Sequence, residues 1–133
     1  MAKEYMKGGE FLIAGQTTAE VFTPEDFSDE HRMIGETCRE YIDNEVVPNL
    51  PALENHAWEV ARDLLKKAGE LGLLGANIPE EYGGMELDQT TGAIIAEMVG
   101  RGSGFGSTYG AQTSIGLLPI LYWGSEELKK EWI

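Results

Sequence analysis

The chain has 133 residues, of which 42% are hydrophobic, so it is long enough for one domain with a buried core. Its 10 basic and 23 acidic residues give a formal net charge of −13, which argues against nucleic acid or an anionic membrane surface as a partner. The single cysteine, Cys38, excludes an intramolecular disulfide and a cysteine metal cluster, and two histidines far apart in sequence favour no metal site.

Residues 1–22 show no helical period and are predicted to form an N-terminal arm. Residues 11–14 give this arm one apolar patch that could pack on the body, on a partner or on another domain. The patch is too short for a membrane span or for the core of a secretory signal. We therefore expect a cytoplasmic protein with no membrane span.

Two helices are predicted over the next part of the chain. Thr23, Pro24 and the acids that follow favour a helix start, and a long helix is expected from there to about Val47, before Pro48 and Pro51. Its apolar positions, spaced three and four residues apart, are Ile34, Cys38, Tyr41, Ile42 and Val46. A second helix is predicted over residues 55–70. Its expected buried stripe is Trp58, Ala61, Leu64, Leu65, Ala68 and Leu71.

Residues 72–84 organise the chain around them, because helical patterns run into this segment and out of it. Gly72 suits the position just past a helix end, where a positive φ is common. Pro79 favours extended backbone before it, and Gly83 with Gly84 permits a turn that few dipeptides tolerate. The pattern predicts a buried non-helical crossing between two helices.

A third helix is predicted from the cap residue Asp88 to Val99. The glycine-rich residues 100–106 that follow could suggest a phosphate-binding loop. They lack the Gly-Lys-Ser/Thr ending, and no predicted strand precedes them. We interpret them as a hinge between two helices.

The fourth predicted helix, residues 107–118, has two different faces. One face is small and polar and the other is more apolar. The first holds Thr108, Ala111, Gln112 and Ile115, and the second Tyr109, Thr113 and Leu117. Small residues let another helix or a slender ligand approach closely, and the residues alone leave both possibilities open.

Pro119 is predicted to end or kink this helix, and Ser125 to cap a further one. The sequence stops at Ile133 inside a helical pattern, so we expect it to be a piece of a longer protein. The expected fold is all-α, a bundle of about five to six helices over residues 23–133.

Several segments resemble the N-terminal helical domain of the acyl-CoA dehydrogenases, in the style of the very-long-chain branch. Residues 72–84 read GLLGANIPEEYGG, which resembles the family's segment after its second helix. Residues 22–27, FTPEDF, resemble the family's first helix, and residues 88–98, DQTTGAIIAEM, its third. Residues 109–121, YGAQTSIGLLPIL, and 124–131, GSEELKKE, resemble its later helices.

The resemblance implies an FAD-dependent oxidoreductase of fatty acid β-oxidation. A glutamate takes the α-proton of a fatty acyl-CoA thioester, the β-hydrogen leaves as hydride to the flavin, and an electron-transfer flavoprotein accepts the electrons. The catalytic glutamate and most FAD contacts would lie in domains beyond residue 133. We therefore assign no catalytic, FAD-binding or metal-binding residue here, and expect this piece alone to be inactive. The resemblance implies that five residues contribute to the fatty-acyl pocket: Thr108, Ala111, Gln112, Ile115 and Gly116.

Other functions stay open at this point. The chain could be a helical interaction module with no ligand of its own. It could also belong to an enzyme with the same fold and different chemistry, an acyl-CoA oxidase or a nitroalkane oxidase. The sequence that follows Ile133 in the gene would separate these possibilities. We also expect a homo-oligomer.

Overall fold

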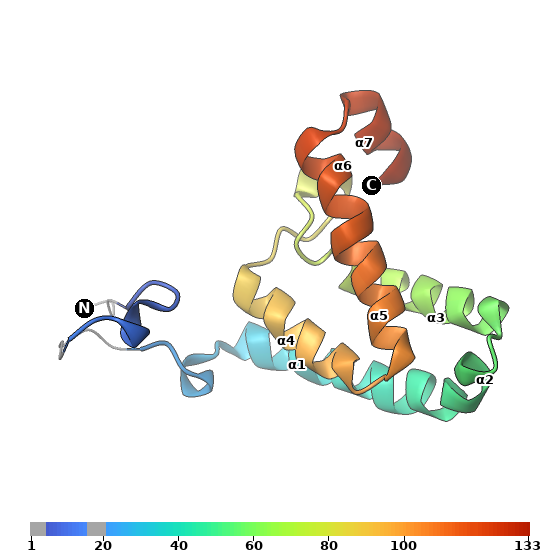
Figure 1. Cartoon of the computed structure of the whole chain (residues 1–133), viewed down its shortest axis with the longest axis horizontal. Helices are drawn as coiled ribbons and strands as arrows, with labels where there is room; N and C mark the ends of the chain where they lie inside the picture. Colours follow the sequence, from blue (N-terminus) through green and yellow to red (C-terminus); the bar gives the residue numbers. More distant parts are fainter. Residues whose placement is uncertain (1–4, 16–20) are drawn as a thin grey trace.

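The structure is a computed structural model that describes residues 5–15 and 21–133 (Figure 1). Helices α1 and α4 pack along each other, α3 lies beside them, and a rod containing α5 and α6 crosses over the group. The α-helices of the described residues are α1 (Asp29–Tyr41), α2 (Leu50–Glu54), α3 (Trp58–Glu70), α4 (Gln89–Gly100), α5 (Gly104–Gly110), α6 (Leu117–Trp123) and α7 (Glu126–Trp132). This part of the chain contains no β-strand, and the predicted all-α fold is confirmed.

None of the helices in residues 5–15 and 21–133 combines the length and the apolar character needed to cross a membrane. The predicted arm of residues 1–22 falls partly on residues 1–4 and 16–20, which lie outside the described residues. Its described residues extend to one side of the helices (Figure 1).

The first helix is shorter and less regular than predicted. Thr23 precedes only a 3-10 turn, Pro24–Asp26, and α1 begins after Ser28, whose Oγ accepts the His31 amide at 3.1 Å. After Tyr41 the backbone widens into a π-helical turn, Ile42–Val46, and then a 3-10 turn, Val47–Asn49. The change has a cause in the sequence, because Pro48 offers no amide hydrogen and its ring crowds the carbonyl four residues before it.

The second predicted helix, residues 55–70, starts three residues later than predicted: α3 begins at Trp58, after His56, whose positive φ of 60° is not helical. Residues 50–54, which precede the predicted start, form the short helix α2. Leu64 and Ala68 are buried as predicted. The prediction that Trp58 and Leu71 are buried is wrong. Trp58 is 70% exposed and stacks on His56, and Leu71 is 46% exposed. Each lies at an end of α3, where the neighbouring elements no longer cover its side.

Residues 72–84 form the predicted buried crossing. Gly72 and Gly83 have positive φ values of 77° and 84°. A Cβ at Gly84 would collide with the Ile78 carbonyl, so only glycine fits this close approach. Leu73 and Ile78 are buried, and the crossing contains the 3-10 turns Leu73–Gly75 and Glu80–Tyr82.

The rod is one continuous helical element, with α5 and α6 joined by a π-helical turn, Ala111–Gly116 (Figure 1). It begins at Gly104, three residues before the predicted start. Pro119 lies in the first turn of α6 and does not end the helix, contrary to one of the two predictions made for it. A π-helical turn is a common place for a helix to absorb such a distortion, and here it comes directly before the proline.

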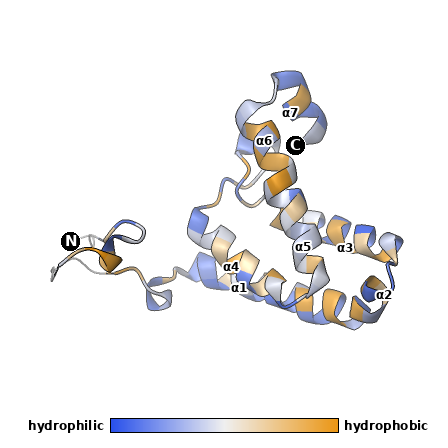
Figure 2. Ribbon diagram, in the orientation of Figure 1, coloured by the Kyte–Doolittle hydropathy of each residue, from blue (hydrophilic) through white to orange (hydrophobic). Residues whose placement is uncertain are grey.

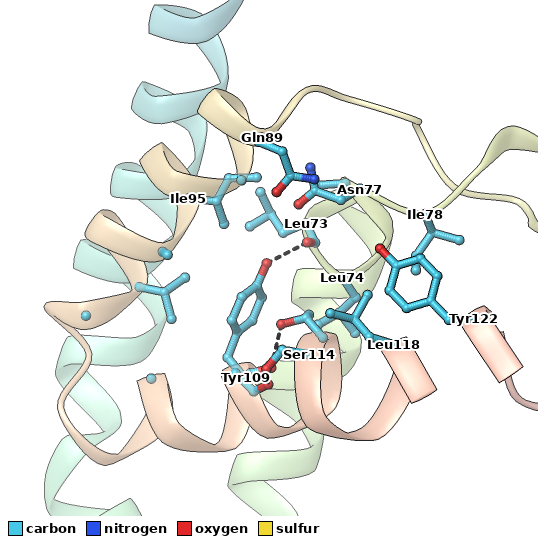
Figure 3. Close-up of a pocket in the computed structure, with 18 residues that line it drawn as sticks. Leu73, Leu74, Asn77, Ile78, Gln89, Ile95, Tyr109, Ser114, Leu118 and Tyr122 are labelled. Carbon is cyan, nitrogen blue, oxygen red and sulfur yellow. Dashed lines mark hydrogen bonds between the residues drawn. The ribbon is translucent and has the colours of Figure 1, made fainter. Parts of the chain in front are cut away.

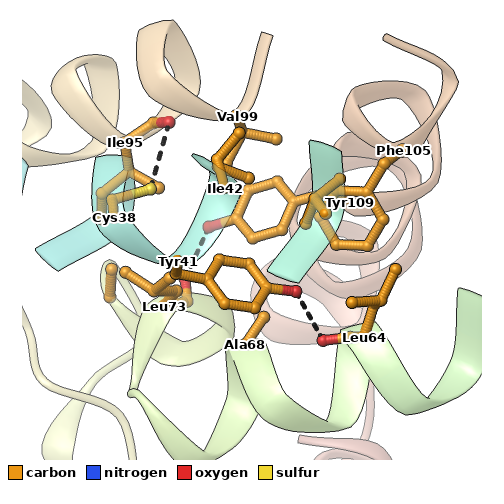
Figure 4. Close-up of a cluster of buried hydrophobic side chains, with 12 residues drawn as sticks. Cys38, Tyr41, Ile42, Leu64, Ala68, Leu73, Ile95, Val99, Phe105 and Tyr109 are labelled. Carbon is orange, nitrogen blue, oxygen red and sulfur yellow. Dashed lines mark hydrogen bonds between the residues drawn. The ribbon is translucent and has the colours of Figure 1, made fainter. Parts of the chain in front are cut away.

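The core lies where α1, α3, α4 and the rod meet (Figure 4). Figure 2 shows that each of these helices carries both apolar and polar residues along its length. The phenol of Tyr41 donates a hydrogen bond to the Leu64 carbonyl at 2.7 Å. Cys38 is fully buried, and burial raises the pKa of its thiol to about 11, as expected of a small core residue rather than a reactive thiol. The buried members of the core are Cys38, Tyr41, Ile42, Val46, Leu64, Ala68, Leu73, Ala76, Ile95, Val99, Phe105 and Tyr109.

Asp88 caps α4 as predicted, and its removal provides a test of the fold. Its carboxylate accepts the Thr91 amide at 2.7 Å, and this bond, with smaller contributions from the Thr91 hydroxyl and His31, lowers its pKa. Asp88→Ala should lower the free energy of unfolding at pH 7 by about 1 kcal/mol, measured by urea denaturation.

Asp88→Asn is the matched control, because an asparagine also caps a helix. The Asp88 pKa is depressed in the folded state, so its contribution is complete above the unfolded pKa of about 3.9 and is lost as the pH falls through the lower folded value. Asp88→Asn should therefore keep most of the stability at pH 7 and lose part of the acid dependence. Equal stability of wild type and Asp88→Ala would contradict the assigned cap.

Candidate functional site

A cavity of about 430 Å³ lies between the crossing segment, α4 and the rod (Figure 3). Leu73 and Ile78 approach it from the crossing, Ile95 from α4, and Tyr109 and Leu118 from the rod. This volume falls in the range typical of pockets for small ligands, and the space between helices of a bundle is a common place for them.

The buried polar groups around this cavity are bonded within the protein. Tyr109 donates its phenolic hydrogen to the Leu73 carbonyl at 2.6 Å, and burial raises its pKa, so it stays a neutral donor. Asn77 Nδ2 donates to the carbonyls of Leu87 and Asp88, each at 2.9 Å. Among the described residues, every buried side-chain nitrogen or oxygen has a partner. The cavity therefore offers a ligand mostly apolar contacts and no evident acid or base.

Four glycines reduce the bulk of the side chains that line the cavity. A Cβ at Gly100 or Gly110 would meet no atom within 4 Å, so both positions open onto free space. At Gly106 a Cβ would lie 3.3 Å from the Val99 carbonyl, and at Gly92 it would lie 2.5 Å from Asn77 Oδ1. Gly92 and Gly106 thus allow α4 to approach its neighbours closely, while Gly100 and Gly110 leave room.

The residues predicted for the fatty-acyl pocket lie on the other side of the rod. They gather on one outward face, and none of them lines the cavity. Ile115 is 80% exposed, which is unusual for a large aliphatic side chain next to small neighbours. We call this set the outer row; its members are Thr108, Ala111, Gln112, Ile115 and Gly116, all exposed.

Sequence reasoning did not assign the cavity residues of the rod, which are Gly110, Thr113, Ser114, Leu118 and Tyr122 together with Tyr109. The apolar face recognised in the sequence, with Tyr109 and Thr113 four residues apart, was a usable signal. The π-helical turn that follows changes the helical phase, because it takes up more residues per turn than the α-helix on which the pattern was based. Leu118 and Tyr122 could not be placed by that pattern.

The glycine-rich segment connects two helices, and its residues do not fit a phosphate group. It joins the end of α4 at Gly100 to the start of α5 at Gly104. Gly102 is buried, and a Cβ there would contact Val46 at 3.1 Å. Arg101 pairs with Asp43 at 2.9 Å. Residues 100–106 therefore form no cradle for a phosphate group.

The hydrogen bond from Tyr109 to Leu73 gives a direct test of how the cavity wall is held. Tyr109→Phe leaves a buried carbonyl without its donor, so the free energy of unfolding should fall by about 1–3 kcal/mol in urea denaturation. The exposed cavity residue Tyr122 is the matched control, and Tyr122→Phe should change stability by less than about 0.5 kcal/mol. Similar losses for both variants would show that the buried bond has no special role.

Comparisons with known proteins identify the family. The model for "Acyl-CoA dehydrogenase, N-terminal domain" matches residues 28–133. A probable acyl-CoA dehydrogenase of Bacillus subtilis (strain 168) is 51% identical over 132 residues, which are 99% of this chain and 22% of that protein. The mitochondrial short-chain specific acyl-CoA dehydrogenase of Rattus norvegicus is 35% identical over 115 residues, 85% of this chain and 27% of that enzyme.

A solved structure agrees with the sequence comparisons. The structure of an acyl-CoA dehydrogenase from Bacillus anthracis, described as complexed with FAD, superposes with a TM-score of 0.87 at 54% identity. The match covers 95% of this chain and 22% of that one. The chain thus spans about a quarter or less of the length of these relatives and belongs to the acyl-CoA dehydrogenase family, as its N-terminal helical domain.

Proposed function

We propose that the parent of this chain is an FAD-dependent dehydrogenase of fatty acyl-CoA thioesters, in which this domain forms one wall of the site for the acyl chain. The outer row of the rod carries this proposal. The outer row combines small residues with the highly exposed Ile115. It therefore offers apolar surface and little steric bulk, which suits a slender aliphatic ligand. Membership of the family supports the same assignment.

In this proposal the domain positions the acyl chain and shields it from water, and it supplies no reacting group. Ala111 and Gly116 let the ligand approach the rod, and Ile115 covers it with apolar surface. The described residues that line the cavity include no carboxylate, histidine, cysteine or basic side chain, and residues 100–106 form no phosphate cradle, so FAD and the catalytic base would be held elsewhere in the parent. FAD supplies the acceptor for the hydride when it is bound.

Further parts of the proposal rest on the resemblance. We expect an electron-transfer flavoprotein as the redox partner, a homo-oligomeric parent and a cytoplasmic location, and these stay predictions. Acyl-CoA oxidase or nitroalkane oxidase chemistry is the alternative on the same fold.

An interaction role is supported by a different observation, the aromatic surface on α6 and α7. Tyr122, Trp123 and Trp132 are all more than half exposed. Apolar patches of this kind usually contact another protein surface. In the parent this surface would pack on another domain, and in the isolated chain it favours self-association.

Ala111→Phe in the full-length parent tests the outer row. The added ring should deny room to the distal part of long acyl chains, so catalytic efficiency should fall for long substrates and be spared for short ones. Each excluded methylene costs about 0.8 kcal/mol, so three would reduce relative efficiency about fifty-fold if that binding is realised in the transition state. Efficiency is measured across a series of chain lengths, with the melting temperature beside it.

Gly110→Leu is the matched control, because Gly110 adjoins Ala111 and faces the inner cavity, where a Cβ meets open space. With the acyl chain on the outer row, Gly110→Leu should leave the chain-length preference unchanged. A shift caused by Gly110→Leu and not by Ala111→Phe would move the acyl site to the cavity. Equal losses at all lengths for Ala111→Phe would retire the pocket assignment.

The isolated chain should bind FAD weakly if at all, because the resemblance places most FAD contacts in domains beyond residue 133 and residues 100–106 form no phosphate cradle. Protein purified in the presence of FAD and then desalted should lack flavin absorbance and should not dehydrogenate acyl-CoA. Stoichiometric flavin after desalting would overturn this expectation. The full-length parent, treated in the same way, is the positive control.

A further inference from the structure

The N-terminal arm carries an ordered apolar turn that its own domain does not cover. Phe11, Leu12 and Ile13 are 49%, 75% and 89% exposed. Figure 2 shows this apolar turn at the end of the molecule farthest from α2 and α3. We call residues 10–13 the knob.

The knob is held in shape by local hydrogen bonds. Glu10–Leu12 form a 3-10 turn, in which the Glu10 carboxylate accepts the Lys7 amide at 3.2 Å and the Glu10 carbonyl accepts the amides of Ile13 and Ala14 at 3.0 and 2.9 Å. Because the turn is already ordered, a partner would not have to supply the entropy cost of forming it.

The start of the arm returns to the body and ties the knob to one place. Tyr5 donates a hydrogen bond to Asp26 at 3.1 Å, and its ring lies edge-on to Phe22 with the centroids 5.4 Å apart. The Phe22 ring in turn contacts the Phe27 ring, with the centroids 6.0 Å apart. The knob is therefore anchored beside the first residues of the domain.

An apolar groove of about 410 Å³ lies at the same end of the molecule, between Phe22, Phe27 and the first two turns of α4. Its floor includes Ala93 and Ile94, and Glu97 is the only charged residue among the described residues that line it. No knob residue is among them. Lys7, the only basic residue among 5–15, lies beside the knob and complements the charge of Glu97.

We propose that the knob of one chain inserts into this groove on a second copy of the chain, and that the exchange is reciprocal. Tyr5, at the start of the arm, contacts Phe22, and Phe22 also lines the groove, so the arm and the groove lie at the same end of the molecule. A twofold axis at this end would bring each knob to the other groove. Each exchange would bury the apolar side chains of Phe11, Leu12 and Ile13, which are exposed to water in the single chain. The interface is distinct from the aromatic surface on α6 and α7.

Intermolecular cross-linking tests the contact. One chain carries Leu12→Cys and the other Ala93→Cys, so that a disulfide between the two sites can form only between copies; Cys38 is buried and is left in place. The matched control replaces Ala93→Cys by Glu59→Cys, at an exposed position on α3. Mild oxidation should give the Leu12–Ala93 heterodimer at least about tenfold faster than the control. Equal rates would overturn the proposal.

Sedimentation equilibrium tests whether the contact drives association. A background with Trp123→Ser and Trp132→Ser removes most of the aromatic surface. In that background, adding Leu12→Asp and Ile13→Asp should raise the dimer dissociation constant by about tenfold or more, because both side chains are exposed and their replacement does not disturb the core. A background that is monomeric at the highest soluble concentration, or a dissociation constant unchanged by the knob variants, would refute the exchange.

Discussion

The hydrogen bond from the Tyr109 phenol to the Leu73 carbonyl joins the two parts of the chain on which the site depends. Leu73 begins a short 3-10 turn in the crossing segment, and its carbonyl is satisfied by a side chain from elsewhere in the chain. Tyr109 comes from the rod and spans the core to reach it. The bond therefore ties the rod to the crossing beside the cavity that lies between them.

The rod has one face packed against the core and one face exposed to solvent. Its inner face contributes Tyr109 and Leu117 to buried packing, and its outer face exposes the small residues around Ala111. The π-helical turn at Ala111–Gly116 lies between α5 and α6, in the part of the rod that carries most of the outer row. Such turns occur often at functional sites, and this one places a proline-containing segment after it without interrupting the helix.

Three groups of exposed apolar side chains in the described residues concern the assembly of this domain: the outer row, the aromatic surface of α6 and α7, and the knob. With a net charge of −13, two such domains repel each other at long range, and this repulsion is screened beyond about 8 Å at physiological salt. Contacts between these apolar groups act at shorter distances. The charge therefore slows encounter more than it weakens a contact once formed.

Much of the fold was determined by sequence alone, because helical period, caps and glycines act locally. Asp88 caps α4, Gly72 takes a positive φ, and the buried faces of α1 and α4 follow the three-and-four spacing. Motifs spread over most of the chain also identified the family. The two exposed side chains predicted as core, Trp58 and Leu71, show where a periodic pattern stops being informative: at helix ends, burial depends on neighbouring elements.

Only the tertiary structure decided the rest. The cavity exists because α4, the crossing and the rod enclose space that glycines leave open, and no single segment encodes that distance. The π-helical turns shift the helical phase, so Leu118 and Tyr122 join a face that a constant period does not predict. The outer row could be named from sequence because it lies on one helix. Its separation from the cavity could not, since which face of a helix is covered depends on what packs against it.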